Sequence, residues 1–221
     1  MEGALILAGE APHEPRGRYC FQTTYVNECY HEYFEKKNGH KIIWVLRNPF
    51  STIYSILDHW SRSGLFELFE AYGSPDLSGR DLKLHKLFGR HGLSHLKMAC
   101  LAYNEKISQL FELVDNLPDG TIKVVEYDAL VKRKNDVLPV IFKFIDLPYD
   151  NDCAELINRK SVEKKDRLSS RKRRIIEKMS APIYKRAKKL VNIEESWNPL
   201  KTKSNRFEFI YPGLQEQISK Y

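Results

Sequence analysis

Apolar residues along this chain fall alternately into short runs and into helical spacing. Two five-residue stretches, 42–46 and 122–126, have the length and β-branched content of strands. The first is wholly apolar, as expected for a strand that is covered on both faces. Residues 93–114 repeat apolar positions at helical spacing, and helices are also expected at about 50–62 and 135–146. Strands that alternate with helices over short connections predict an α/β fold, a parallel sheet flanked by helices.

The remaining stretches are placed around this central part. Residues 18–24 have the aromatic and β-branched content of a strand, and 27–37 are typical of a helix. Residues 62–92 are broken by glycines and hold several aromatic residues, so we expect an insertion of short helices. That insertion either covers a substrate cleft as a lid or has a packing role alone. Residues 1–221 are expected to form a single domain, with an irregular tail from Trp197.

Composition and cysteine usage are those of a folded cytoplasmic domain. With 221 residues and 42% hydrophobic content, the chain can bury a packed core, which excludes global disorder. No apolar run approaches the length of a membrane span. The four cysteines are scattered without a Cys-x-x-Cys pair, which argues against a disulfide framework or a metal site. A reducing, cytoplasmic location is therefore expected.

The positive charge of the chain is concentrated in one segment. Residues 159–189 hold 14 Lys or Arg and three Asp or Glu, a balance of +11, whereas the rest of the chain has a balance of −4. Such a basic segment attracts polyanions in general. Nucleic acid is not the expected partner, because Tyr184 is the segment's one aromatic residue for base stacking.

The sequence around the first strand has the features of an anion-binding site. Arg47 follows the strand directly, Asn48 can cap the next helix, and Pro49 suits its first position. The strand end and the free N–H groups of the helix start would then face one space, where anions bind in open α/β sheets. Ser55 lies about two helical turns further on, within reach of a phosphate that Arg47 grips. The alternative is an ordinary strand, turn and helix with an exposed arginine.

The same residues carry a family resemblance. Arg47-Asn-Pro49, with a serine eight residues after the arginine, resembles the 3′-phosphate-binding segment of sulfotransferases that use 3′-phosphoadenosine 5′-phosphosulfate (PAPS). Downstream, 121–131 and 137–149 are similar to the family's V-x-Y-E-D-L-V and F-L-G-L-P-Y blocks. A third stretch, 175–182, is similar to the last helix of many members.

The resemblance implies a P-loop-NTPase-like sulfotransferase core that takes PAPS as co-substrate and needs no metal. It also implies that Arg47, Ser55 and Tyr127 contact the nucleotide. In relatives a basic loop after the second block closes over the nucleotide. The candidates here are Lys164, Lys165 and Arg167, and the alternative is a solvated charge run.

The N-terminal part departs from the family pattern. Members begin with a strand, a Gly/Ser/Thr-rich phosphate loop and a helix, but Ala11-Pro-His-Glu-Pro15 lacks the Ser or Thr of such a loop. The family's lysine or histidine about two dozen residues before the arginine is missing from 21–24. The core is therefore expected to be N-terminally incomplete, through truncation, a split protein or divergence. The catalytic base is unassigned, and His13 is the one candidate in the N-terminal loop.

Two functions follow as hypotheses. The first is a sulfotransferase that moves a sulfuryl group from PAPS to a hydroxyl or amine of a small-molecule, carbohydrate or protein acceptor, or an inactive descendant of one. The alternative is a non-catalytic nucleotide- or polyanion-binding protein on the same fold. A small-molecule kinase is disfavoured, because the chain has no Gly-x-x-x-x-Gly-Lys-Ser/Thr loop.

Overall fold

The computed structural model describes residues 41–74, 77–155, 157 and 167–192. The strand expected at 18–24, the helix expected at 27–37, the loop with His13 and the irregular tail lie outside these residues. The chain divides into one unit of residues 1–191 and a second of 192–221, so nearly all described residues belong to the first. The prediction of a single domain over 1–221 stays a prediction.

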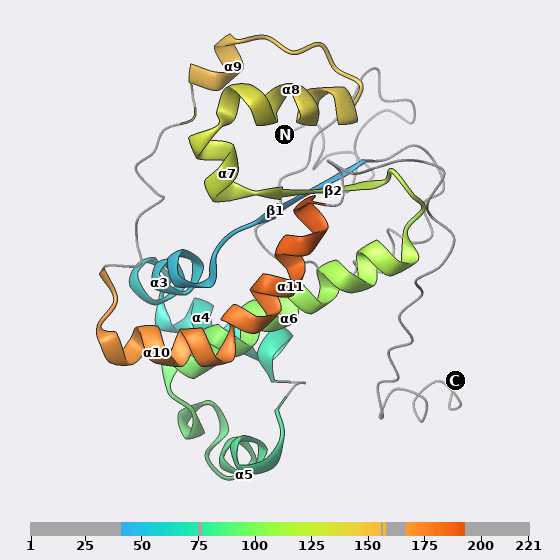
Figure 1. Cartoon of the computed structure of the whole chain (residues 1–221). Helices are drawn as coiled ribbons and strands as arrows, with labels where there is room; N and C mark the ends of the chain where they lie inside the picture. The colour runs from blue at the N-terminus through green and yellow to red at the C-terminus, as the bar shows by residue number, and fades with distance from the viewer. Residues whose placement is uncertain (1–40, 75–76, 156, 158–166, 193–221) are drawn as a thin grey trace, which may run out of the picture. The chain divides into compact units, whose positions relative to one another are not determined.

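Two strands pair in parallel at the centre of the described region. Strand β1 spans Ile42–Leu46 and β2 spans Ile122–Glu126, with Ile42 opposite Ile122 and Leu46 opposite Glu126. Helix α8 (Lys134–Phe144) lies on one face of the pair, and α6 (His95–Asn116) and α11 (Ala181–Asn192) lie on the other (Figure 1). The expected α/β arrangement, a parallel sheet flanked by helices, is therefore confirmed. The P-loop-like core and its incompleteness stay predictions.

The two faces of the sheet pack into separate apolar clusters. Trp44, Leu46 and Val124 belong to the larger cluster around α3 and α6, and Ile43 and Val125 belong to the smaller one under α8. This division follows from the alternation of side chains along a strand. Val45 shares the α8 face but is 52% exposed, so the prediction of a first strand covered on both faces is wrong at this position.

Short helices make up the connections. They are α3 (Pro49–His59), α4 (Arg62–Leu68), the π-helix η1 (Phe69–Gly73), α5 (Gly79–Phe88), the 3₁₀-helix η2 (Gly89–Gly92), α7 (Tyr127–Lys132), α9 (Asp152–Glu155) and α10 (Ser170–Met179). The expected insertion at 62–92 is thus a series of short helices, whereas its role as a lid stays a prediction. In the part of the chain that the structure describes, no helix has the length and apolar character needed to cross a bilayer.

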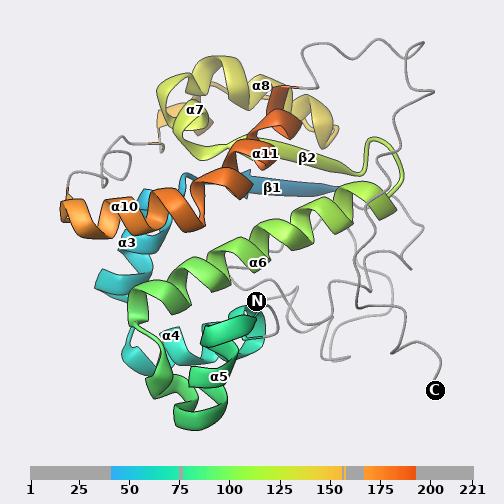
Figure 2. The same ribbon diagram turned by 60° about the horizontal axis from the view of Figure 1, so that its bottom comes forward.

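The buried Phe69 ring helps to hold the insertion against α6. Phe69 of η1 is 0% exposed, and its ring lies edge to face with His85 of α5 at 5.6 Å between centroids. A Cβ at Gly73 would lie 2.7 Å from the Phe69 ring and 3.0 Å from the Ala102 nitrogen, so this position needs glycine. Figure 2 shows α4 and α5 beside α6, on the side away from the sheet. The π-helix is therefore one of the packing contacts that fix the insertion on α6.

Candidate functional site

The parallel register brings the carboxyl ends of both strands to one edge. Leu46 pairs with Glu126, so Arg47 and Tyr127 leave the sheet side by side. The guanidinium carbon of Arg47 lies 4.7 Å from the centroid of the Tyr127 ring, within the range of a cation–π contact. Two of the three predicted site residues, from separate sequence blocks, are therefore neighbours.

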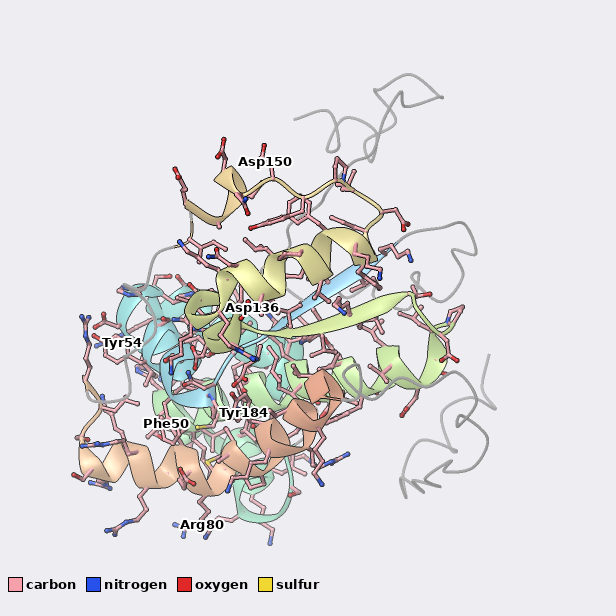
Figure 3. The ribbon with its side chains drawn as sticks, turned by 45° about the horizontal axis from the view of Figure 1, so that its top comes forward. Phe50, Tyr54, Arg80, Asp136, Asp150 and Tyr184 are labelled. Carbon is pink, nitrogen blue, oxygen red and sulfur yellow. The ribbon has the colours of Figure 1, made fainter. Side chains whose placement is uncertain are left out.

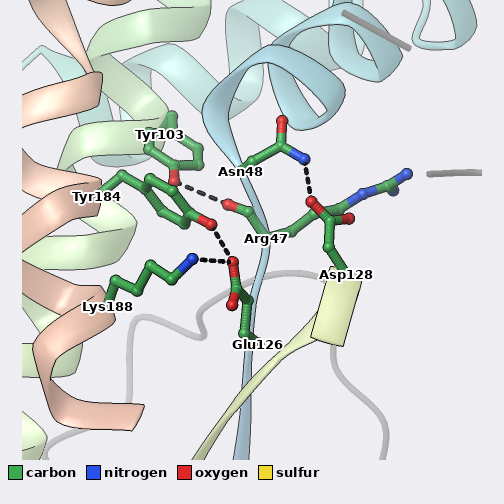
Figure 4. Close-up of polar contacts among 7 residues, drawn as sticks. All are labelled: Arg47, Asn48, Tyr103, Glu126, Asp128, Tyr184 and Lys188. Carbon is green, nitrogen blue, oxygen red and sulfur yellow. Dashed lines mark hydrogen bonds and ion pairs between the residues drawn. The ribbon is translucent and has the colours of Figure 1, made fainter. Parts of the chain in front are cut away.

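Asn48 joins the two helices that start at this edge. Its side-chain oxygen accepts from the Ser51 N–H at 2.8 Å, which caps α3 as predicted. Its Nδ2 donates to Asp128 Oδ2 at 2.6 Å, across 80 residues of sequence (Figure 4). The other oxygen, Asp128 Oδ1, is buried and accepts no hydrogen bond from the described residues. Asn48 thus holds a partly buried carboxylate beside Arg47.

The start of α3 offers fewer backbone N–H groups for binding an anion than the sequence suggested. Pro49 has none, the Ser51 N–H is taken by the Asn48 side chain, and the Thr52 N–H donates to the Asn48 carbonyl at 3.2 Å. The expectation that these backbone donors face an anion is therefore wrong for Ser51 and Thr52. An anion at this edge would therefore depend on the Arg47 side chain rather than on these two backbone donors.

Replacing Asn48 with alanine should lower the free energy of unfolding by about 1 kcal/mol or slightly more. The change removes a helix cap and also the donor to Asp128, whose carboxylate loses its bond inside the fold. Urea denaturation measures the effect. Ser94→Ala is the matched control, because Ser94 caps α6 through the Lys97 N–H at 3.3 Å and its hydroxyl makes no second hydrogen bond within the described residues. Equal losses in the two variants would contradict a role for the Asn48–Asp128 bond.

The remaining predicted residues lie on or near α3. Ser55 sits in the second turn of α3 and is half-buried. The guanidinium carbon of Arg167 is 5.9 Å from the ring centroid of Tyr54, the residue before Ser55 on the same helix (labelled in Figure 3). Lys164 and Lys165 lie outside the described residues. One member of the predicted basic loop therefore adjoins the helix that carries Ser55.

A second polar cluster at the same edge was missed by sequence reasoning. Tyr184 of α11 donates its hydroxyl to Glu126 Oε1 at 2.5 Å, and Lys188 Nζ lies 3.0 Å from the same oxygen. The Glu126 side chain is only 12% exposed. Tyr103 of α6 donates to the Arg47 carbonyl oxygen at 2.8 Å (Figure 4). These contacts fix the backbone of Arg47 and the end of β2.

Both tyrosines of this cluster stay protonated at neutral pH. Burial raises the pKa of Tyr184 well above its usual range near 10, and the hydrogen bond to Glu126 and the negative charges of Glu126 and Asp128 raise it further. Burial also raises the pKa of Tyr103, and the neighbouring Tyr184 adds to the effect. Each hydroxyl therefore acts as a hydrogen-bond donor. The one sequence feature that drew attention to this cluster was Tyr184, the single aromatic residue of the basic segment 159–189, and it was considered there only for base stacking.

The buried Cys100 does not support nucleophilic cysteine chemistry. Cys100 is a free, fully buried thiol, and burial raises its pKa to about 11. The thiolate is the nucleophilic form, so Cys100 is inert at neutral pH. In the described ranges no three His, Cys, Asp or Glu side chains are grouped as metal ligands.

Comparisons with known proteins give one structural likeness. No family model matches the chain, and no curated protein matches its sequence. Among solved structures, the chain is similar to a sulfotransferase domain from the curacin biosynthetic pathway, with a TM-score of 0.38 and 15% sequence identity. The match covers 64% of this chain and 53% of that domain, about half its length. At this TM-score the likeness carries no argument about function.

Proposed function

We propose that this chain is a PAPS-dependent sulfotransferase whose nucleotide binds at the carboxyl ends of β1 and β2. One observation carries the proposal: the guanidinium carbon of Arg47 lies 4.7 Å from the centroid of the Tyr127 ring at that edge. The two residues come from separate sequence blocks that resemble sulfotransferases. In open α/β sheets, ligands bind outside the carboxyl ends of the strands. The parallel pairing of these two strands supports that placement.

The residues at this edge suit a phosphorylated nucleoside. A guanidinium that stacks on an aromatic ring keeps its N–H donors in its own plane, where a phosphate can accept two of them. Ser55 would add a hydroxyl, and Arg167, which lies near Tyr54 of α3, would add a second positive charge. Tyr103 would position Arg47 by holding its carbonyl oxygen. PAPS supplies the sulfuryl group that is transferred to a hydroxyl or amine acceptor.

Calorimetry of 3′-phosphoadenosine 5′-phosphate against AMP tests the proposal. The 3′-phosphate should tighten binding by about tenfold, because a charge-assisted contact to Arg47 contributes on the order of 1.5 kcal/mol. Arg47→Ala should bind both nucleotides equally. Arg133→Ala is the matched control, since Arg133 is an exposed arginine that follows α7 and should leave the preference unchanged.

A second outcome separates this function from the polyanion-binding alternative. Helix α10 begins with Arg171, Lys172 and Arg174, all exposed, although positive charge is unfavourable at a helix start. These residues favour an anionic partner. Negligible binding of both nucleotides by the unmodified chain would overturn the sulfotransferase proposal and leave the polyanion-binding alternative.

A further inference from the structure

Helix α5 has one face on the protein body and one face in solvent. None of its residues is buried, yet Asp81, Leu82, Leu84 and His85 are partly covered. The exposed residues of the helix include Arg80, Lys83, Lys86 and Leu87. At 100° per residue these four positions share one side of the helix, opposite to Asp81 and His85. The outer face of the helix therefore carries three cationic side chains together with one leucine.

The inner face is fixed by specific contacts. Lys97 of α6 pairs with Asp81 at 2.6 Å, and the His85 ring packs against Phe69 at 5.6 Å. After the helix, the chain passes so close that a Cβ at Gly92 would lie 2.4 Å from the Leu84 carbonyl oxygen. These contacts orient α5, so its outer face is presented by a fixed support.

Two large apolar side chains stand in water at the end of this helix. Leu87 is 74% exposed and Phe88 is 60% exposed, more than any other large hydrophobic residue in the described ranges. Gly89 has a φ of 55°, a conformation that favours glycine, and it ends the helix directly after Phe88. Adjacent exposed apolar residues of this size indicate a contact surface.

The charge of the outer face has one sign. Arg80 projects from the edge of the ribbon (Figure 3), and Lys83 and Lys86 follow at successive turns. Asp81 is the one carboxylate in the helix, and it lies on the inner face, paired with Lys97. The outer face therefore combines three cations with the exposed Leu87, and the exposed Phe88 lies at the C-terminal end of the helix. Cations beside exposed apolar side chains suit an anionic membrane surface, which attracts the charges and takes up the apolar groups.

We propose that the outer face of α5 docks on an anionic membrane surface. Arg80, Lys83 and Lys86 contact lipid headgroups, and Leu87 and Phe88 enter the boundary with the acyl chains. Leu87 and Phe88 are the last two residues of the helix, so its C-terminal end would enter the interface first. A single-stranded nucleic acid is less suited to this surface, because Phe88 is the one exposed ring of the helix on which a base could stack. This inference does not depend on the nucleotide site.

Sedimentation with lipid vesicles tests the inference on the full chain. The protein should bind vesicles that contain about one-quarter phosphatidylserine in phosphatidylcholine, and should bind pure phosphatidylcholine far more weakly. Lys83→Ala should weaken binding about fivefold. The double variant Leu87→Ser with Phe88→Ser should weaken it about tenfold. Matched controls are Lys178→Ala on α10 and Val140→Ser on α8, since Val140 is also exposed at 48% and both should bind normally.

Several results would overturn the inference. One is a failure of the unmodified chain to bind anionic vesicles. Another is binding that survives the α5 changes but is lost in Lys178→Ala, which would move the contact to α10. A third is a dimer of the free protein that the double variant dissociates, which would assign the apolar residues to a second copy. Circular dichroism should show unchanged folding of every variant, because the altered side chains are exposed.

Discussion

Phe69→Ala should lower the free energy of unfolding by about 3–5 kcal/mol, the cost of removing a fully buried aromatic ring. The ring is 0% exposed and lies between α6 and the helices of the insertion. It also meets His85 edge to face, so its loss removes one of the contacts that hold α5 in place. The backbone at Gly73 sits too close to α6 for the cavity to collapse easily. Urea denaturation, followed by circular dichroism, measures the loss.

Phe88→Ala is the matched control for this change. It removes the same side chain from the same insertion, but Phe88 is 60% exposed, so stability should change by no more than about 0.5 kcal/mol. A small loss for Phe69→Ala would mean that the insertion is only loosely packed on α6. The two variants also distinguish a loss of stability from a loss of membrane binding, since Phe88→Ala should weaken vesicle binding while leaving the fold intact.

The central fold could be predicted because local sequence signals and burial agree there. The two strands end where Asn48-Pro49 and Tyr127-Asp128 begin new helices, and β2 starts after the turn at Gly120. A short β-branched run between turn residues leaves few alternatives to a strand. The broken pattern of 62–92 likewise predicted short helices, although it could not show that Phe69 would anchor them.

The contacts at the site could not be predicted, because they join residues far apart in sequence. Tyr184 and Glu126 are 58 residues apart, and Asn48 and Asp128 are 80 apart. No periodicity connects such pairs, and a glutamate at a strand end is typically expected to be solvated. The neighbourhood of Arg47 and Tyr127 was implied by the family resemblance alone. The pairing of the strands then supplied the physical reason, a shared carboxyl edge.

Tyr184→Phe should lower the free energy of unfolding by about 1.5–3 kcal/mol, the contribution of a hydrogen bond to a charged group. The change deletes one oxygen and leaves the ring in place. Among the described residues, Lys188 then remains as the partner of Glu126, whose side chain is 12% exposed. A carboxylate that is removed from water needs its hydrogen bonds, so the loss falls on the folded state. Urea denaturation at neutral pH measures it.

Lys188→Met is the control, and its cost should be smaller, about 0–1 kcal/mol, because the lysine side chain is 47% exposed and its ion pair is screened by solvent. The pH dependence of stability gives a second readout. The pKa of Tyr184 is raised in the folded state. The contribution of Tyr184 to the free energy of unfolding is therefore fully present below the unfolded pKa of about 10 and is lost as the pH rises further. The difference between the unmodified chain and Tyr184→Phe should therefore shrink above pH about 10, by about 1.4 kcal/mol for each pH unit. Cys100 titrates in both proteins and cancels in this difference, whereas Tyr103 keeps the part of its raised pKa that burial causes and loses only the part that Tyr184 adds. A difference that stays constant up to pH about 11 would show that Tyr184 ionises equally in the folded and unfolded states, contrary to its burial beside Glu126.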